Sequence, residues 1–153
     1  MLIEGIHALN PILTRNLPEN DIKRIYIEPE KGYYLNGEEI FSPFDLRLLR
    51  RMTRDELFRG WSAEKTLIQW KSVLEGEKIY IEPYIPLADI KVNSSVEFEP
   101  GIYSDILCEM LSNIGENSAF FEYSETLSEK LALFEKIPLK KLPEYSLLHE
   151  FVG

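Results

Sequence analysis

The sequence contains little that could cross-link the chain or anchor it in a membrane. Cys108 is its single cysteine, so an internal disulfide and a cysteine-rich zinc site are both excluded. No apolar run approaches the roughly 18 residues of a membrane-spanning helix. The first residues also lack the basic and apolar segments of a signal peptide. We therefore expect a cytoplasmic protein that has no membrane partner.

Basic residues are scarce. The 153 residues include 17 Lys and Arg against 26 Asp and Glu, which gives a formal net charge of -9. A surface this acidic repels long polyanions, so we expect no nucleic-acid partner. The hydrophobic fraction of 44% and the charged fraction of 28% are ordinary for a globular chain, and they exclude a disordered or collagen-like protein.

A phosphate-binding loop is also missing. Gly32 and Gly37 have the spacing of the motif G-x-x-x-x-G-K-[ST], but Glu38 and Glu39 follow in place of lysine and serine or threonine. Two carboxylates at that point would repel phosphate, and a hairpin turn at Asn36-Gly37 explains the glycines. The sequence contains no G-x-G-x-x-G motif either, so it holds no P-loop.

Local patterns predict an α/β fold with a small sheet. The apolar Leu2-Ile3 is typical of the last residues of a buried strand whose earlier part is absent, followed by a turn at Gly5 and a short helix that Asn10-Pro11 begins. Alternating or turn-flanked residues predict strands at 22–27 and 89–93 and a hairpin at 33–40, and capping signals and apolar spacing predict helices at 43–59, 62–76, 102–114 and 125–137.

The helix at 43–59 has the clearest signals. Ser42 is a good N-cap, Pro43 occupies the first helical position, and Asp45 completes a capping box. Gly60 suits a left-handed C-cap. The spacing of Phe44, Leu48 and Met52 predicts the buried stripe of this helix.

Five arginines fall on this helix or at its end: Arg47, Arg50, Arg51, Arg54 and Arg59. Helical spacing places Arg47, Arg51 and Arg54 on one face. Arginine favours planar, bidentate binding of phosphate or carboxylate, so the cluster indicates a phosphate-bearing small molecule. The alternative, which the sequence leaves open, is a solvated face with local ion pairs to Asp55, Glu56 and other acids.

Three stretches resemble the uridine kinase/phosphoribulokinase family of P-loop kinases, in its bacterial uridine kinase-like branch, which is often fused to a TGS domain. They are Glu4-Gly5-Ile6-His7-Ala8-Leu9-Asn10-Pro11, the arginine pattern from Asp45 to Gly60, and Phe58-Arg59-Gly60-Trp61-Ser62-Ala63-Glu64 with Thr66, Leu67, Trp70, Ser72 and Val73 after it. The similarity extends to the tail Glu150-Phe151-Val152-Gly153 and so covers nearly the whole chain.

The resemblance implies the C-terminal part of a three-layer α/β kinase, with residues 1–100 in the kinase domain, a lid helix at 43–59 and a helical extension at 101–153. It implies ATP- and Mg²⁺-dependent phosphoryl transfer to the 5′-hydroxyl of uridine or cytidine. By the family's pattern, Arg51, Arg54 and Arg59 are catalytic, and Arg47 and Arg51 bind the nucleotide phosphates. Gln69 contacts the nucleoside and Glu4 lies at the metal.

An alternative is a non-catalytic, degenerate kinase half that acts as a binding or interaction module. Leu74-Glu75 stands where this branch commonly has two arginines, and the family's P-loop half would precede Met1. We expect the isolated chain to be inactive and to hold no tightly bound ATP or Mg²⁺. We also expect it to pack against the missing N-terminal kinase half, or to self-associate through the strand edges that this half would cover.

Overall fold

The computed structural model describes residues 1–153, and the chain is an α/β protein, as the sequence predicts. Its contacts separate two units. Unit 1 comprises Met1–Glu28 and Lys71–Ser94, and unit 2 comprises Pro29–Trp70 and Ser95–Gly153. Helix α2 (Ala63–Tyr80) contributes its first half to unit 2 and its second half to unit 1. The assignment of residues 1–100 to a kinase domain and of 101–153 to an extension stays a prediction.

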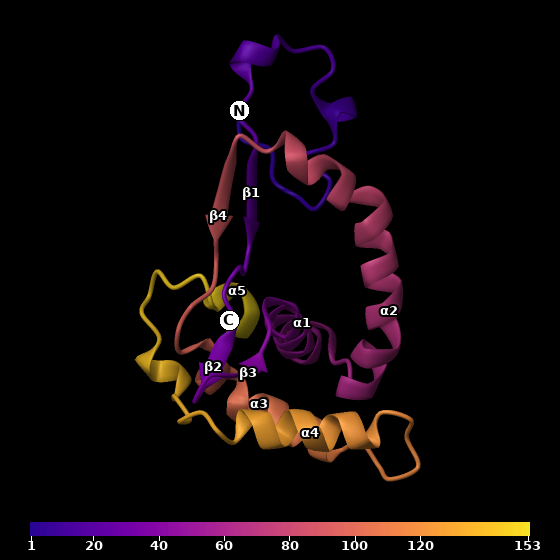
Figure 1. Ribbon diagram of the computed structural model, residues 1–153, viewed down its shortest axis with the longest axis vertical. Helices are drawn as coiled ribbons and strands as arrows, with labels where there is room; N and C mark the ends of the chain where they lie inside the picture. Colours follow the sequence, from indigo (N-terminus) through magenta and orange to yellow (C-terminus); the bar gives the residue numbers. More distant parts are fainter. The chain divides into compact units, whose positions relative to one another are not determined.

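Unit 1 contains a two-stranded parallel sheet and three short helices. Strands β1 (Ile25–Glu28) and β4 (Ile90–Asn93) lie side by side, with Ile25 opposite Ile90 and Ile27 opposite Val92 (Figure 1). The 3₁₀ helices are η1 (Pro11–Leu13), η2 (Glu19–Asp21) and η3 (Glu82–Leu87). The predicted strands at 22–27 and 89–93 are thus present, although β1 begins and ends later than expected.

The predicted buried strand at the start of the chain is wrong. Leu2 is 87% exposed, Ile3 is 44% exposed, and neither belongs to a strand. Two apolar residues cannot form a strand without a neighbour to hydrogen-bond with, and no strand pairs with them here. The turn at Gly5 is confirmed, since its carbonyl accepts a hydrogen bond from the Ala8 amide. The Asn10 cap of η1 is also confirmed.

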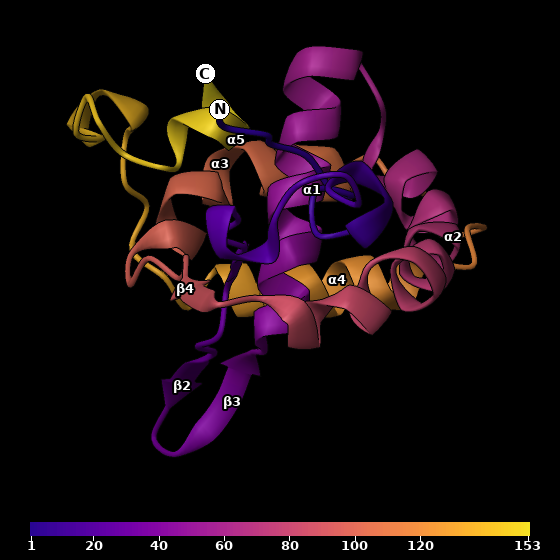
Figure 2. The ribbon, with the colours of Figure 1, turned by 90° about the horizontal axis from the view of Figure 1, so that it is seen from above.

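Unit 2 builds its core around α1 (Pro43–Arg59), which contacts β3, α3 and α5. Its other elements are β2 (Tyr33–Leu35), β3 (Glu38–Phe41), α3 (Glu99–Ser112), α4 (Phe121–Leu131), the 3₁₀ helix η4 (Leu139–Lys141) and α5 (His149–Val152). Figure 2 shows the antiparallel β2–β3 pair as a hairpin with a tight turn. The completely buried side chains include Phe41, Leu46, Leu49, Met52, Leu107, Leu131 and Leu148.

The ends of α1 form as the sequence predicts. The Ser42 side chain accepts a hydrogen bond from the Asp45 amide, and the Asp45 carboxylate accepts one from the Ser42 amide. Gly60 has φ 61° and ψ 36°, the left-handed conformation that a C-cap requires. The predicted stripe is correct for Leu48 and Met52, but Phe44 is 43% exposed.

We expect Ser42→Ala to lower the free energy of unfolding by about 1 kcal/mol, because the Asp45 amide then loses its hydrogen-bond acceptor. Urea denaturation followed by circular dichroism measures this difference. Ser112→Ala is the matched control, since the Ser112 hydroxyl donates only to a carbonyl at the end of α3 and caps no helix start. Equal losses in the two variants would contradict the capping role.

Three helices differ from their predicted bounds. Helix α3 starts at Glu99 and ends at Ser112, whereas the prediction was 102–114. Helix α2 starts after Ser62 as predicted, but it continues through Gly76 to Tyr80. A glycine costs a helix only about 1 kcal/mol, so it does not end one whose following residues continue the helical hydrogen bonds. Helix α4 spans Phe121–Leu131 and therefore starts and ends earlier than the predicted 125–137. The turn after it lets the Phe134 ring stack on the Phe41 ring of the hairpin, with 5.5 Å between the ring centres. No helix has both the length and the apolar composition to cross a membrane.

Candidate functional site

The arginines of α1 are held by ion pairs with several different acids. Arg51 and Arg59 pair with Asp55, Arg54 with Glu150, and Arg50 with Glu99. The guanidinium of Arg47 lies 6.0 Å from the centre of the Trp70 ring. The sequence-based alternative of local ion pairs is therefore confirmed for Asp55, while Glu56 pairs with none of the arginines.

Asp55 joins two of the predicted catalytic arginines. Its side chain is completely buried and accepts a hydrogen bond from Arg51 Nε at 2.7 Å and one from Arg59 Nη1. The Thr66 hydroxyl of α2 donates a third at 3.1 Å. The three arginine and aspartate positions are four residues apart on one helix, so helical geometry alone brings them together. We call Arg51, Asp55 and Arg59 the arginine–aspartate cluster.

A second cation and an aromatic ring lie beside this cluster. Arg59 lies 5.7 Å from the centre of the Trp61 ring, and Lys65 Nζ lies 4.0 Å from it. Both cations interact favourably with the face of the indole. Their charges thus lie within about 10 Å of each other, which is one Debye length at moderate salt. Trp61 and Lys65 are the residues of this surface to which sequence reasoning assigned no role.

Arg54 does not bind Asp55 and contacts α5 instead. Its Nη1 donates to Glu150 of α5 at 3.1 Å, and its guanidinium lies 5.9 Å from the Phe151 ring. Arg54 Nε is buried without a hydrogen-bond partner. The structure therefore brings Arg51 and Arg59 together and separates Arg54 from them, although the helical spacing had placed Arg54 on one face with Arg51.

Arg50 belongs to the core of unit 2. Two of its guanidinium nitrogens donate to the Glu99 carboxylate, which is completely buried and also accepts from the Tyr103 hydroxyl at 2.8 Å. Burial lowers the pKa of Arg50, but the hydrogen bonds and charge of Glu99 outweigh burial and leave that pKa above its ordinary value. Burial, reinforced by the Glu99 charge, raises the pKa of Tyr103. This arginine supports the fold.

The two remaining predicted site residues are exposed. Gln69 lies on α2 within unit 2. Glu4 belongs to unit 1, where no strand positions it, so its predicted place at the end of a buried strand is wrong. No group of three or more His, Cys, Asp and Glu side chains lies close enough together to hold a metal ion. The metal-binding role of Glu4 and the nucleoside-binding role of Gln69 stay predictions.

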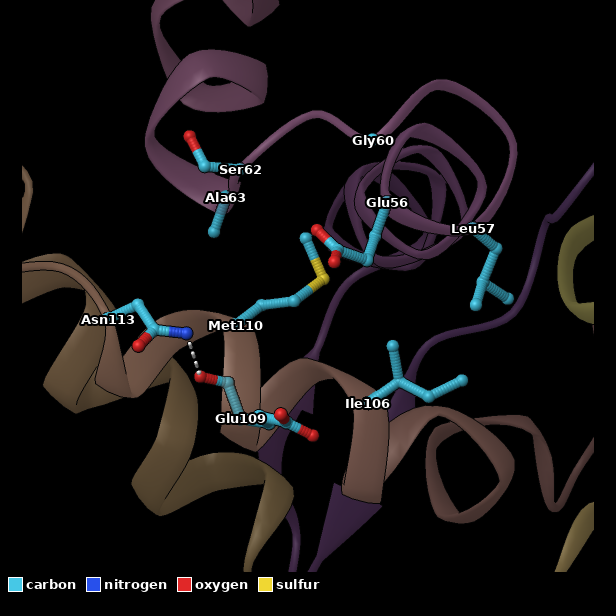
Figure 3. Close-up of a pocket in the computed structure, with 9 residues that line it drawn as sticks. All are labelled: Glu56, Leu57, Gly60, Ser62, Ala63, Ile106, Glu109, Met110 and Asn113. Atoms are coloured by element: carbon cyan, nitrogen blue, oxygen red, sulfur yellow. Dashed lines mark hydrogen bonds between the residues drawn. The ribbon is translucent and has the colours of Figure 1, made fainter.

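A cavity of about 440 Å³ lies between the end of α1, the start of α2 and α3. Figure 3 shows the Glu56 carboxylate and the Met110 sulfur pointing toward one another across it. Its lining residues are Glu56, Leu57, Gly60, Ser62, Ala63, Ile106, Glu109, Met110 and Asn113. None of the predicted site residues lines it, and its two carboxylates repel phosphate.

Comparisons with family models, with curated protein sequences and with solved structures find no match.

Proposed function

We propose that this chain binds a phosphorylated nucleotide through the arginine–aspartate cluster, and that it does so as part of a uridine kinase-like phosphotransferase that transfers phosphate from ATP to a nucleoside hydroxyl. The observation that carries the proposal is the buried Asp55 carboxylate that holds two guanidinium groups eight residues apart. The resemblance of the arginine pattern to the uridine kinase/phosphoribulokinase family supports the same reading.

The charges of this surface favour an anion. Arg51, Arg59 and Lys65 carry three positive charges, and Asp55 offsets one of them. Arg51 binds Asp55 through Nε and Arg59 binds it through Nη1, so each guanidinium keeps further N–H donors outside that contact. The Arg51 side chain is 23% exposed and that of Arg59 is 43% exposed, which leaves both within reach of a ligand.

Asp55 also holds the two arginines in place before a ligand arrives. An exposed arginine loses much of its side-chain freedom when it binds a phosphate, and this loss weakens binding. A buried carboxylate that already fixes the guanidinium removes part of that cost. In phosphoryl transfer, positioned arginines stabilise the charge on the transferring group.

The described residues fit a phosphate group better than a complete ATP–magnesium site. The Trp61 indole holds Arg59 and Lys65 beside each other, where the two cations can bind one phosphate group. The sequence supplies no phosphate loop, and Glu4 has no neighbouring acids that would complete a set of metal ligands. ATP and Mg²⁺ remain part of the proposal on the resemblance alone, and we derive no step through the metal.

A second candidate function is a non-catalytic module that binds a nucleotide or another protein. It is favoured by the use of Arg50 and Arg54 in internal ion pairs with Glu99 and Glu150. Two of the five arginines thus form ion pairs within the folded chain instead of facing a ligand alone.

Phosphoryl transfer from ATP to uridine and cytidine in the natural full-length protein tests the proposal. We expect Arg59→Gln to lower kcat by at least about 100-fold, because it removes a positive charge at the transferring phosphate. Arg15→Gln, which removes an exposed arginine of unit 1, is the matched control and should leave kcat unchanged. Turnover that is insensitive to Arg59→Gln would contradict the catalytic role of Arg59. If no nucleoside is phosphorylated, the kinase activity is contradicted and the non-catalytic binding module is favoured.

A further inference from the structure

The β1–β4 sheet of unit 1 exposes an apolar face. Ile25 is 49% exposed, Ile27 60%, Ile90 47% and Val92 40%. The register places these four side chains in two opposed pairs on one face. Parallel strands in globular proteins are normally buried on both faces, and two strands alone are too few for independent stability. The small number of strands, rather than the exposed face, points to the strand edges as places where further strands can add.

The backbone hydrogen bonds show which groups of β1 are free. The Arg24 carbonyl accepts from the Asp89 and Ile90 amides, and the Glu28 carbonyl accepts from the Ser94 amide. Because backbone groups alternate in direction along a strand, the N–H and C=O groups of Ile25 and Ile27 point to the other edge. No strand pairs with that edge, and no backbone hydrogen bond from a turn or loop reaches Ile25 or Ile27.

This edge is complementary to itself. When two copies of β1 run antiparallel about Tyr26, Ile25 of each copy faces Ile27 of the other, and Arg24 faces Glu28. The free groups of Ile25 and Ile27 then form hydrogen-bonded pairs across the junction, whereas Tyr26 meets Tyr26 in a non-hydrogen-bonded pair. No like charges face each other along this strand.

The outer edge of β4 lacks this property. An antiparallel pairing centred on Lys91, the residue level with Tyr26 in the β1–β4 register, would place Lys91 directly opposite Lys91. Like charges at such a position are destabilising, and an edge lysine is a common means of blocking strand addition. A two-fold pairing centred at the level of Tyr26 and Lys91 is thus favoured at β1 and disfavoured at β4.

We propose that two copies of this chain associate through their β1 edges, antiparallel about Tyr26, and form a four-stranded sheet in the order β4–β1–β1–β4. The interface has two-fold symmetry, so it closes after two copies. It joins the apolar faces of both sheets into one surface of eight aliphatic side chains, four from each copy. The pairing specifies how the chain self-associates and does not depend on the phosphate site.

Disulfide trapping tests the register. In a Cys108→Ser background, Tyr26→Cys places two thiols opposite each other in a non-hydrogen-bonded pair, where the Cα separation of about 4.5 Å permits a disulfide. Lys91→Cys is the matched control on the outward edge of β4. We expect mild oxidation to convert most of the Tyr26→Cys chain, and at least about tenfold less of the Lys91→Cys chain, to covalent dimer. Equal cross-linking, or none, would overturn the proposal.

Sedimentation equilibrium supplies an independent measurement. Ile27→Pro removes an outward N–H donor from β1, and Lys91→Pro removes one from β4, in each case without taking a donor from the β1–β4 ladder. We expect a dimer mass for the unmodified chain and for Lys91→Pro, and a monomer mass for Ile27→Pro with an unchanged far-ultraviolet circular dichroism spectrum. A monomeric unmodified chain, or open-ended assembly, would contradict the pairing. Both results are read without ligand, so they are distinguishable from failure of the phosphate site.

Discussion

Replacing Glu99 by alanine is expected to lower the free energy of unfolding by about 3–5 kcal/mol. Glu99 is completely buried and is the charge partner of Arg50, which is only 6% exposed. Without the carboxylate, the guanidinium remains in the core of unit 2 as an uncompensated charge, and the Tyr103 hydroxyl loses its acceptor. Removal of one member of a buried ion pair is costly for this reason.

Two further variants distinguish this explanation from a general effect of removing a side chain. Glu97→Ala removes an exposed carboxylate two residues away and should change the stability by less than about 0.5 kcal/mol. The double variant Arg50→Met/Glu99→Leu removes both charges and should recover much of the loss, because apolar residues of similar volume often replace a buried pair without cost. Urea denaturation measures all three, and equal losses for Glu97→Ala and Glu99→Ala would contradict the role of the buried pair.

Replacing Asp55 by asparagine is expected to affect both stability and ligand binding. The Asp55 carboxylate accepts from three donors, those of Arg51, Arg59 and Thr66. Asparagine keeps the shape but places an N–H₂ group against at least one of these donors, so a charge-assisted hydrogen bond is lost. We expect unfolding to become easier by about 2 kcal/mol and affinity for ATP to fall, because the two guanidinium groups are no longer held together.

Glu56→Gln is the matched control for this substitution. Glu56 is the next residue on α1, but it lines the cavity beside Met110 and forms no ion pair with the arginines. We expect it to leave both stability and ATP affinity nearly unchanged, as urea denaturation and ligand titration can show. A Glu56→Gln effect as large as that of Asp55→Asn would mean that any loss of negative charge at this end of α1 has the same result.

Structures that depend on neighbouring residues were predictable from the sequence. The capping box at Ser42 and the C-cap at Gly60 define α1, and both appear as predicted. The hairpin is likewise set by its turn, where Asn36 has φ 53° and Gly37 has φ 89°, the positive angles that a tight hairpin turn requires. In each case the signal and its structural consequence lie within a few residues.

Structures that depend on distant partners were predicted less well. Leu2 and Ile3 have the composition of a strand but no strand to pair with. The helix predicted at 125–137 gives way to a turn after Leu131 because Phe134 packs on the β2–β3 hairpin, nearly a hundred residues earlier. Packing between residues so far apart in the sequence cannot be predicted from the local spacing of apolar residues.

The same distinction applies to the candidate site. Arg51, Asp55 and Arg59 meet because they are four residues apart on one helix, so their ion pairs could be anticipated. Arg50 and Glu99 are 49 residues apart, and nothing near either residue indicates that they pair. The spacing of Arg54 and Arg51 predicts one shared helical face, yet Arg54 donates a hydrogen bond to Glu150 of α5.

We propose that the surface formed by Arg51, Arg59, Trp61 and Lys65 binds a phosphorylated nucleotide, and NMR tests this directly. The chain has two tryptophans, so an ATP titration followed by NMR reports on two indole N–H signals, which Trp61→Phe assigns. We expect a saturable shift of the Trp61 signal, with an ATP affinity that Arg59→Gln lowers at least about tenfold and that Arg15→Gln leaves unchanged. The signal of Trp70, which is 9% exposed, should not move. An unchanged Trp61 signal, or equal shifts of both indoles, would contradict the claim.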